Sequence, residues 1–216
     1  QDFNAVKKVL VKAGGKYAEN GFVFKRPGVE VYDLLLNLQK TNLQKVTQFF
    51  PTPDALADDL VALAELDEFA AQTILEPEAG DGQIVRAIRR ALPTPVKVFG
   101  YEFDEGNRRE LELIPEFNLL GADFLSCGTT FDRIIANPPF SGNQDIIHIR
   151  KMYECLNEKG VLVSVASTHF RVSKKKTETA FRAWLEEKRA AIIEVPAGSF
   201  KTSGTNVETV IIKIRK

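Results

Sequence analysis

The side chains best suited to chemistry stand in one short run, Asn137-Pro138-Pro139-Phe140, which follows the apolar segment 131–136. Two consecutive prolines remove two N–H donors and fix φ near about −65°, so the run forms a stiff turn whose carbonyl oxygens remain acceptors. Asn137 adds a side-chain carbonyl, and Phe140 adds an aromatic face. Such a set would hold a planar group that carries an amine, such as a nucleobase or an amide. The alternative is that Asn-Pro-Pro only ends a strand.

An aromatic amine is a poor nucleophile, because its lone pair is delocalised into the ring. Two acceptors on its hydrogens would favour a pyramidal nitrogen and would stabilise the charge that develops there during attack on an electrophile. Neither a metal ion nor a covalent nucleophile is needed for this chemistry.

A glycine-rich turn, Gly80-Asp81-Gly82, precedes a helical pattern. Its glycines allow a tight turn and a close approach of the backbone to a ligand. The third glycine of a dinucleotide fingerprint is replaced by Val85, which disfavours a pyrophosphate at this turn. Glu76 and Asp81 flank the turn, would repel phosphate and would suit a ligand with a cationic centre.

Glu102 closes the next apolar run, where an acid can accept hydrogen bonds from both ribose hydroxyls. A nucleoside with a positive charge and no phosphate meets these demands, and S-adenosylmethionine is that molecule. The alternative is that Gly-Asp-Gly is an ordinary turn between a strand and a helix.

The elements that must position these residues alternate along the chain from residue 51. Apolar runs at 73–76, 96–101, 118–120, 132–136, 161–166, 191–195 and 207–214 alternate with helical patterns at 83–92, 105–113, 144–156 and 174–188. This alternation predicts a doubly wound, Rossmann-like α/β sheet that is mostly parallel, with ligands at the carboxyl ends of its strands. The last two runs are too close for a crossover, so the final strand is expected to be antiparallel. Thr52 is predicted to cap a helix that begins at Pro53.

Residues 1–48 are predicted to form a small separate unit with a linker, and residues 49–216 the ligand-binding domain. The small unit shows a basic helical pattern at 7–16 and an apolar strand at 21–24. The chain opens on Gln1, which is typical of a fragment or a processed chain.

Composition excludes several classes of protein. The chain has 216 residues and 44% hydrophobic side chains. It has no apolar run near the roughly 18 residues that a membrane span needs, and no secretory leader, so a cytoplasmic protein is expected. Two cysteines and two histidines form neither a disulfide framework nor a zinc-binding pattern, so no metal is expected.

The net charge of zero conceals an uneven distribution. Residues 51–140 carry 7 basic and 17 acidic side chains, whereas residues 1–50 carry 8 basic and 4 acidic ones, and residues 141–216 carry 14 and 8. The acidic centre is the segment expected to bind a cationic ligand. The basic flanks leave room for a nucleic-acid partner that the total charge alone would disfavour.

The motifs resemble a known family. In this order, Gly80-Asp81-Gly82, Glu102, Asp123-Phe124 and Asn137-Pro138-Pro139-Phe140 resemble the motifs of class I amino-methyltransferases. Phe49-Phe50-Pro51-Thr52-Pro53 resembles the N-terminal element of gamma-class adenine-specific DNA methyltransferases, and the resemblance covers residues 49–216. The whole chain is also similar to small methyltransferase-like proteins common on phage and plasmid genomes.

The resemblance implies a role for each matched position in binding S-adenosylmethionine. It implies that Glu102 binds the ribose, and that Asp123 accepts from the exocyclic amine of the cofactor. It implies that Phe103 and Phe124 pack against the adenine ring of the cofactor. The positions implied at the methionine end are Thr52, Pro53, Glu76, Gly80 and Gly82.

On the substrate side, the resemblance implies that Asn137 and the Pro138 carbonyl accept from the substrate amine, with Pro139 stiffening the turn and Phe140 stacking on the base. Phe200 resembles the second stacking aromatic of gamma-class enzymes, and a core aromatic is its alternative. The sequence departs from the family at Glu78, because that position is usually small or neutral. This departure puts the methionine end of the cofactor site in doubt.

Other candidates are less specific. Arg171, Lys174, Lys175, Lys176, Arg182, Lys188 and Arg189 form a basic region that would contact a phosphate backbone or would simply be a solvated helix face. His148 and His169 are isolated, and packing is the favoured interpretation of both over a role as general base.

The sequence therefore predicts an S-adenosylmethionine-dependent methyltransferase that modifies the exocyclic amine of adenine in DNA. Guanine amines of RNA and glutamine amides of proteins are the alternative substrates. A further alternative is a regulatory or anti-restriction protein that binds the cofactor without efficient catalysis, because the chain ends at its last predicted strand, where gamma-class enzymes continue into a target-recognition domain. Weak nucleic-acid binding by the small N-terminal unit, or a partner protein, would then supply recognition.

Overall fold

The computed structural model describes residues 7, 10–11, 14–18, 21–26, 28, 30–31, 50–67, 72–92, 94, 96–200 and 207–216. The chain divides into two compact units, residues 1–49 and 50–216. In the first unit, β1 (Lys16–Ala18) and β2 (Gly21–Val23) form an antiparallel hairpin. The strand predicted near residues 21–24 is present. The helix predicted to continue to residue 16 ends earlier, because Lys16 already lies in β1.

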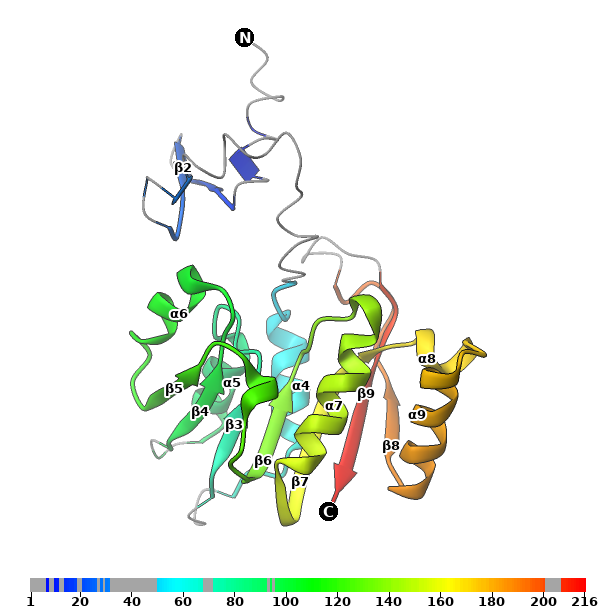
Figure 1. Ribbon diagram of the computed structural model, residues 1–216. Helices are drawn as coiled ribbons and strands as arrows, with labels where there is room; N and C mark the ends of the chain where they lie inside the picture. Colours follow the sequence, from blue (N-terminus) through cyan, green and yellow to red (C-terminus); the bar gives the residue numbers. More distant parts are fainter. Residues whose placement is uncertain are drawn as a thin grey trace. The chain divides into compact units, whose positions relative to one another are not determined.

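The second unit contains a sheet of seven strands within its described residues (Figure 1). The strand order is β5-β4-β3-β6-β7-β9-β8, and β9 runs antiparallel to both of its neighbours. The predicted α/β architecture with an antiparallel last strand is confirmed. The strands are β3 (Ile74–Glu76), β4 (Val98–Tyr101), β5 (Phe117–Gly121), β6 (Phe131–Ala136), β7 (Leu156–Ser167), β8 (Ala191–Glu194) and β9 (Thr209–Arg215).

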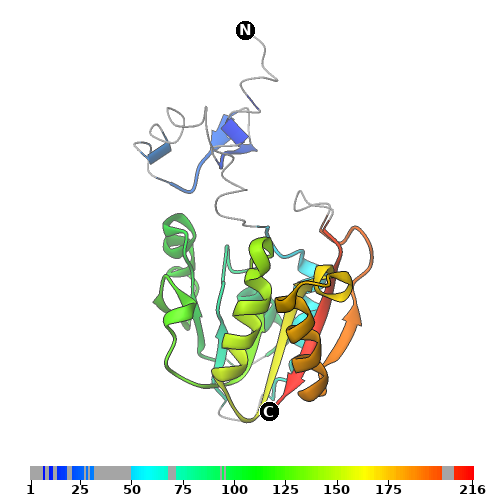
Figure 2. The same ribbon diagram turned by 45° about the vertical axis from the view of Figure 1, so that its right-hand side comes forward.

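Helices cover both faces of this sheet (Figures 1 and 2). One hydrophobic cluster joins the inner side chains of α4 and α5 to one face, and a second cluster joins those of α7, α8 and α9 to the other. The helices are α4 (Asp54–Leu63), α5 (Gln83–Ala91), α6 (Glu105–Leu111), α7 (Gln144–Glu154), α8 (His169–Val172) and α9 (Lys176–Glu187). Among the described residues, no helix is long and apolar enough to cross a membrane.

The prediction that Thr52 caps α4 is wrong. The helix begins at Asp54, and Pro53 takes the cap position with extended backbone (φ −59°, ψ 143°) and no side-chain hydrogen bond. The Thr52 hydroxyl instead accepts a hydrogen bond from Asn137. A long-range partner has therefore replaced the local one.

Candidate active site

Three predicted site residues follow neighbouring strands at the same edge of the sheet. Glu76 ends β3, Glu102 follows β4, and Asn137 follows β6. β3 lies between β4 and β6 and pairs in parallel with both. The helix after β3 packs on one face of the sheet and the helix after β6 on the other, so the chain diverges between these two strands. Such a divergence opens a crevice at the carboxyl ends of the strands.

Glu76 is a buried acid with an unsatisfied oxygen. Its side chain is 2% exposed, and its Oε2 atom has no hydrogen-bond partner among the described residues. Burial raises the pKa of this carboxyl well above its usual range, and the nearby Glu78 and Glu102 carboxyls raise it further. A buried carboxylate is costly unless a cation or donors compensate it. Glu76 therefore favours a positively charged ligand at this turn.

The glycine turn has a backbone that only glycine adopts easily. Gly80 and Gly82 have φ of +56° and +86°. A Cβ atom on Gly82 would also lie 2.7 Å from Ile114 Cδ1. The tight turn predicted from the glycines is present, and it lies close to the end of α6, at Leu111, and to Ile114 just beyond it.

Glu102 ties this turn to the end of β4. Its Oε2 atom accepts a hydrogen bond from the Gly80 N–H at 2.7 Å, and its Oε1 atom accepts one from the Asp104 N–H at 2.7 Å. Burial raises the pKa of the Glu102 carboxyl to about 7, even though the Gly80 N–H favours the charged form. The carboxyl is therefore in place beside the turn and changes its charge near neutral pH.

Glu78, the position that departs from the family pattern, has an unexpected partner. Its Oε1 atom is hydrogen-bonded to Nδ1 of His148 on α7, and its Oε2 atom is buried without a partner in the described part of the chain. Burial raises the pKa of Glu78, and His148 opposes that rise. Burial also lowers the pKa of His148, but Glu78 raises it more, so the net shift is upward. The interpretation of His148 as a packing residue missed this contact, because the two residues are 70 positions apart.

The Asn137 side chain is oriented by the segment before α4. Its Nδ2 atom donates to Thr52 Oγ1 at 3.0 Å and to the Phe50 carbonyl at 3.3 Å. Because a backbone carbonyl can only accept, the amide nitrogen must face Phe50, and Oδ1 must face the other way. This Oδ1 atom is buried and has no partner within residues that the structure describes. The acceptor predicted from the sequence is therefore present and unused.

The predicted aromatic residues differ in how much ring they expose. The Phe140 ring is half-buried and contacts the Phe200 ring edge-on, with centroids 6.3 Å apart. Phe200 is 1% exposed, a burial that matches the core-aromatic alternative. Phe124 is also buried in the core, where its ring contacts Tyr101 and His148. Phe103, in contrast, is 80% exposed and offers a whole ring face.

Asp123 lies at an exposed turn directly before Phe124. Its Oδ1 atom accepts from the Leu125 N–H at 2.9 Å and so caps the short 3₁₀ turn Phe124–Ser126. This local bond fixes the carboxylate at the end of β5, next to the strand that Glu102 follows.

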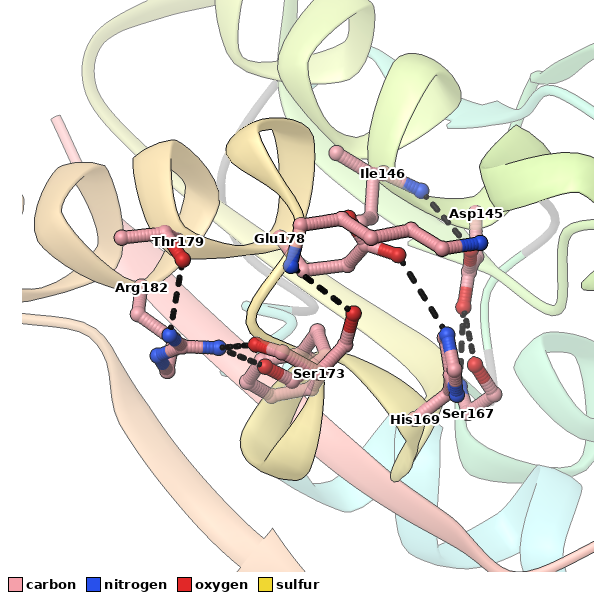
Figure 3. A network of polar contacts seen from close by, with 10 residues as sticks. Asp145, Ile146, Ser167, His169, Ser173, Glu178, Thr179 and Arg182 are labelled. Atoms are coloured by element: carbon pink, nitrogen blue, oxygen red, sulfur yellow. Dashed lines mark hydrogen bonds and ion pairs between the residues drawn. The ribbon is translucent and has the colours of Figure 1, made fainter.

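Part of the predicted basic region has a structural role. Figure 3 shows Arg182 of α9 donating to the Ser173 carbonyl at 2.8 Å and to Thr179 Oγ1 at 3.0 Å. His169 lies 3.3 Å from the buried Glu178 carboxylate. These contacts hold α8 against α9. Exposed side chains are those of Lys174 and Lys175, in the turn between these helices, and of Lys176, the first residue of α9.

Comparisons with known proteins agree on the fold. No protein-family model matches the chain. The methyltransferase subunit of a type I restriction–modification system from Streptococcus thermophilus superposes with a TM-score of 0.64 and 22% identity, over 87% of this chain and 48% of that one. Protein PH1948 of Pyrococcus horikoshii, a candidate RNA methyltransferase, superposes over 99% of each chain with a TM-score of 0.57 and 18% identity. The fold is that of class I S-adenosylmethionine-dependent methyltransferases.

A relationship in sequence is more specific. The chain is 37% identical over 91 residues to the type II methyltransferase M.TthHB8I of Thermus thermophilus. The match spans 41% of this chain and 20% of that protein. The chain thus has the fold of class I methyltransferases and is similar in sequence to a type II methyltransferase over the matched residues. It spans less than half the length of either the Thermus thermophilus protein or the Streptococcus thermophilus subunit.

Proposed function

We propose that this chain transfers a methyl group from S-adenosylmethionine to the exocyclic amine of adenine in DNA. The observation that carries the proposal is the unused Oδ1 atom of Asn137, held in a fixed orientation at the carboxyl end of β6 by Thr52 and Phe50. A neutral acceptor that is buried and unpaired suits a neutral N–H donor. An aromatic amine is such a donor.

The residues around the glycine turn suit the proposed cofactor. Glu76 supplies a buried carboxyl with one unused oxygen for a cationic centre, and the turn at Gly80 and Gly82 allows a close approach of the backbone. Glu102 can accept from ribose hydroxyls, and the exposed ring of Phe103 can cover an adenine ring. When bound, the sulfonium of the cofactor supplies an activated methyl group and a good leaving group.

The chain would act mainly by orientation and by charge stabilisation. Asn137 Oδ1 and the Pro138 carbonyl would each accept a hydrogen bond from the substrate amine. These two hydrogen bonds would direct the nitrogen lone pair toward the methyl group. The same two oxygens would stabilise the positive charge that develops on the nitrogen. Proline at 138 and 139 keeps the acceptors in place without competing N–H donors.

DNA is proposed as the substrate because of the sequence relationship to a type II methyltransferase and the exposed lysines at 174–176. A base in a duplex must flip out to reach the site, at a cost of a few kcal/mol. Stacking on an aromatic ring contributes about 1–3 kcal/mol per base and would offset most of that cost. The half-buried Phe140 is the ring proposed for this role. A partner protein is proposed to supply target recognition.

The test is transfer of radiolabelled methyl groups from S-adenosylmethionine to duplex DNA, single-stranded DNA, RNA and protein in parallel, followed by nucleoside analysis. We expect label in N6-methyladenine of DNA, and at least about 100-fold less of it with the Asn137→Ala variant. Label in guanine of RNA or in protein glutamine would overturn the proposed substrate. Cofactor binding without label in any arm would support a regulatory protein instead.

A further inference from the structure

The contact between Glu78 and His148 joins two parts of the molecule that the sheet leaves unconnected. Glu78 lies in the turn after β3, and His148 lies in α7, which begins soon after the loop that carries Asn137. The ladder between β3 and β6 pairs only Ile74 with Arg133 and Leu75 with Ile134. We call the turn after β3, residues 77–82, the cofactor turn, and the loop after β6, residues 137–143, the acceptor loop. Beyond those two pairs, no hydrogen bond of the β3–β6 ladder connects the cofactor turn to the acceptor loop. The side-chain pair spans them at this point.

Helix α7 is well suited to transmit such a connection. Its first turn carries Asp145, whose buried carboxylate accepts from the Ser167 N–H at 2.9 Å and the Ser167 hydroxyl at 2.8 Å, at the end of β7 (Figure 3). His148 lies three residues later and therefore near Asp145 on the helix surface. Two successive turns of α7 are thus held, one to β7 and one to the turn after β3.

We propose that Glu78 and His148 are positioning residues that set the distance between the cofactor turn and the acceptor loop; this inference rests on the proposed function. Methyl transfer requires the donor, the methyl carbon and the attacking nitrogen in line. A misplacement of about 1 Å costs on the order of 100-fold in rate. A buried contact between the two halves of the site is a direct way to limit such misplacement.

The acidic side chains around His148 favour its protonated form. The carboxyls of Glu78, Asp123 and Asp145 all favour protonated His148, and together they raise its pKa against the effect of burial. On the other side, Glu78 raises the pKa values of both Glu76 and Glu102. Because the pKa of His148 is raised by folding, the contribution of its positive charge is full below the ordinary value of 6.5 and is lost as pH rises through the folded value.

The experiment is a double-mutant cycle with Glu78→Ala, His148→Ala and the double variant. Single-turnover methyl transfer and calorimetric cofactor binding are measured for each. We expect each single variant to lose about 10- to 100-fold in rate with less than a threefold change in cofactor Kd. The double variant should lose no more than the worse single one. Additive losses, or a loss in Kd equal to the loss in rate, would overturn the proposal.

A second measurement needs no turnover. Amide hydrogen exchange of peptides that cover residues 140–148 should become faster in Glu78→Ala, because the loop and α7 lose their tie to the turn. Unchanged exchange would refute a positioning role. Exchange could instead be faster while none of the DNA, RNA or protein substrates is methylated. That outcome would reject the proposed function but would still support the structural connection between Glu78 and His148.

Two controls separate positioning from general damage. His169→Ala removes an exposed histidine that also faces a carboxylate, Glu178, but has no contact with the turn after β3 among the described residues. We expect it to keep the wild-type rate. We also expect the wild-type rate to fall as pH rises through the pKa of His148, because the histidine then loses its charge, and His148→Gln should remove that fall. A fall that persists in this variant would contradict the assigned titration.

Discussion

The cofactor turn and the acceptor loop follow adjacent strands, yet their polar groups are arranged in opposite ways. The turn gathers buried carboxyls, and Glu76 and Glu78 each keep one oxygen without a partner in the part of the chain described. At the loop, the polar side chain is Asn137, which is uncharged. Its Nδ2 atom donates both of the hydrogen bonds that the side chain makes. Its single unused atom is a neutral acceptor. The first arrangement suits a cation, and the second suits a neutral amine.

The difference has an energetic consequence. A buried neutral acceptor without a partner costs about 1–3 kcal/mol, whereas a buried charge costs more and shifts its pKa instead. Burial raises the pKa values of Glu76 and Glu102, so it favours the protonated forms of these two carboxyls in the free protein. Binding of a cation should therefore change the protonation of the turn, whereas binding of an amine at the loop should not.

The largest effect is expected at the loop. Asn137→Ala removes the unused acceptor, and we expect methyl transfer to fall by about 100- to 1000-fold, as for loss of one group that stabilises a developing charge. Cofactor Kd, measured by calorimetry, should change by no more than about twofold. Asn118→Ala on β5 is the matched control and should retain full activity. Normal turnover in Asn137→Ala would show that the unused acceptor of the loop does not bind the substrate amine.

At the turn we expect effects of opposite sign on stability and on binding. Glu76→Gln replaces a buried acid with a neutral side chain, so the free energy of unfolding at pH 8 should rise by about 1–3 kcal/mol. Cofactor affinity should fall about 10- to 100-fold, because the cation loses its partner. Denaturant titration and calorimetry measure the two changes, and the exposed Glu105→Gln serves as control. A loss of stability would show that Glu76 has a compensating contact in the free protein.

The sequence was sufficient to predict the alternation of elements, because strands buried on both faces appear as continuous apolar runs. The boundaries of β3, β4 and β6 differ from the prediction by at most two residues. β7 begins five residues before the predicted strand, at Leu156, because the polar residues 157–160 carry no strand pattern. The pairing of Leu156 with Phe131 of β6 extends it, whereas the long ladder with β9 starts only at Val161.

The motifs of the site were equally visible, because each lies within a few residues at one strand end. Two contacts that orient them were not. Thr52 with Asn137 and Glu78 with His148 join residues 85 and 70 positions apart, and each pair depends on how α4 and α7 pack on the sheet. The residues around Thr52 favour it locally as a helix cap, whereas nothing near Glu78 in the sequence indicates a histidine partner. Long-range partners of this kind follow from the packed structure alone.

The third prediction concerns pH. Burial raises the pKa of Glu102 from its ordinary 4.5 to about 7, so the carboxyl gains its charge only as pH rises through that value. Its contribution to folding stability is correspondingly full below about pH 4.5 and is lost toward pH 7 and above. If ribose binding uses the charged form, cofactor affinity should rise about tenfold between pH 6 and pH 8, by calorimetry. Glu102→Gln should bind more weakly and show a flatter dependence, whereas an equally steep one would assign the titration elsewhere.

The smallest effect decides to which region Thr52 belongs. The resemblance to gamma-class enzymes implies that Thr52 contacts the methionine moiety, but its hydroxyl accepts from Asn137 Nδ2. Thr52→Val removes this acceptor and leaves the Phe50 carbonyl as the partner of the Asn137 amide. The loss of one hydrogen bond should destabilise the orientation of the amide by about 1 kcal/mol and lower the rate about fivefold. Thr52→Ser keeps the hydroxyl and should keep the rate. A change in rate at constant Kd would assign Thr52 to the acceptor loop. A weaker Kd at constant rate would assign it to the cofactor turn, and the two regions would then share a residue.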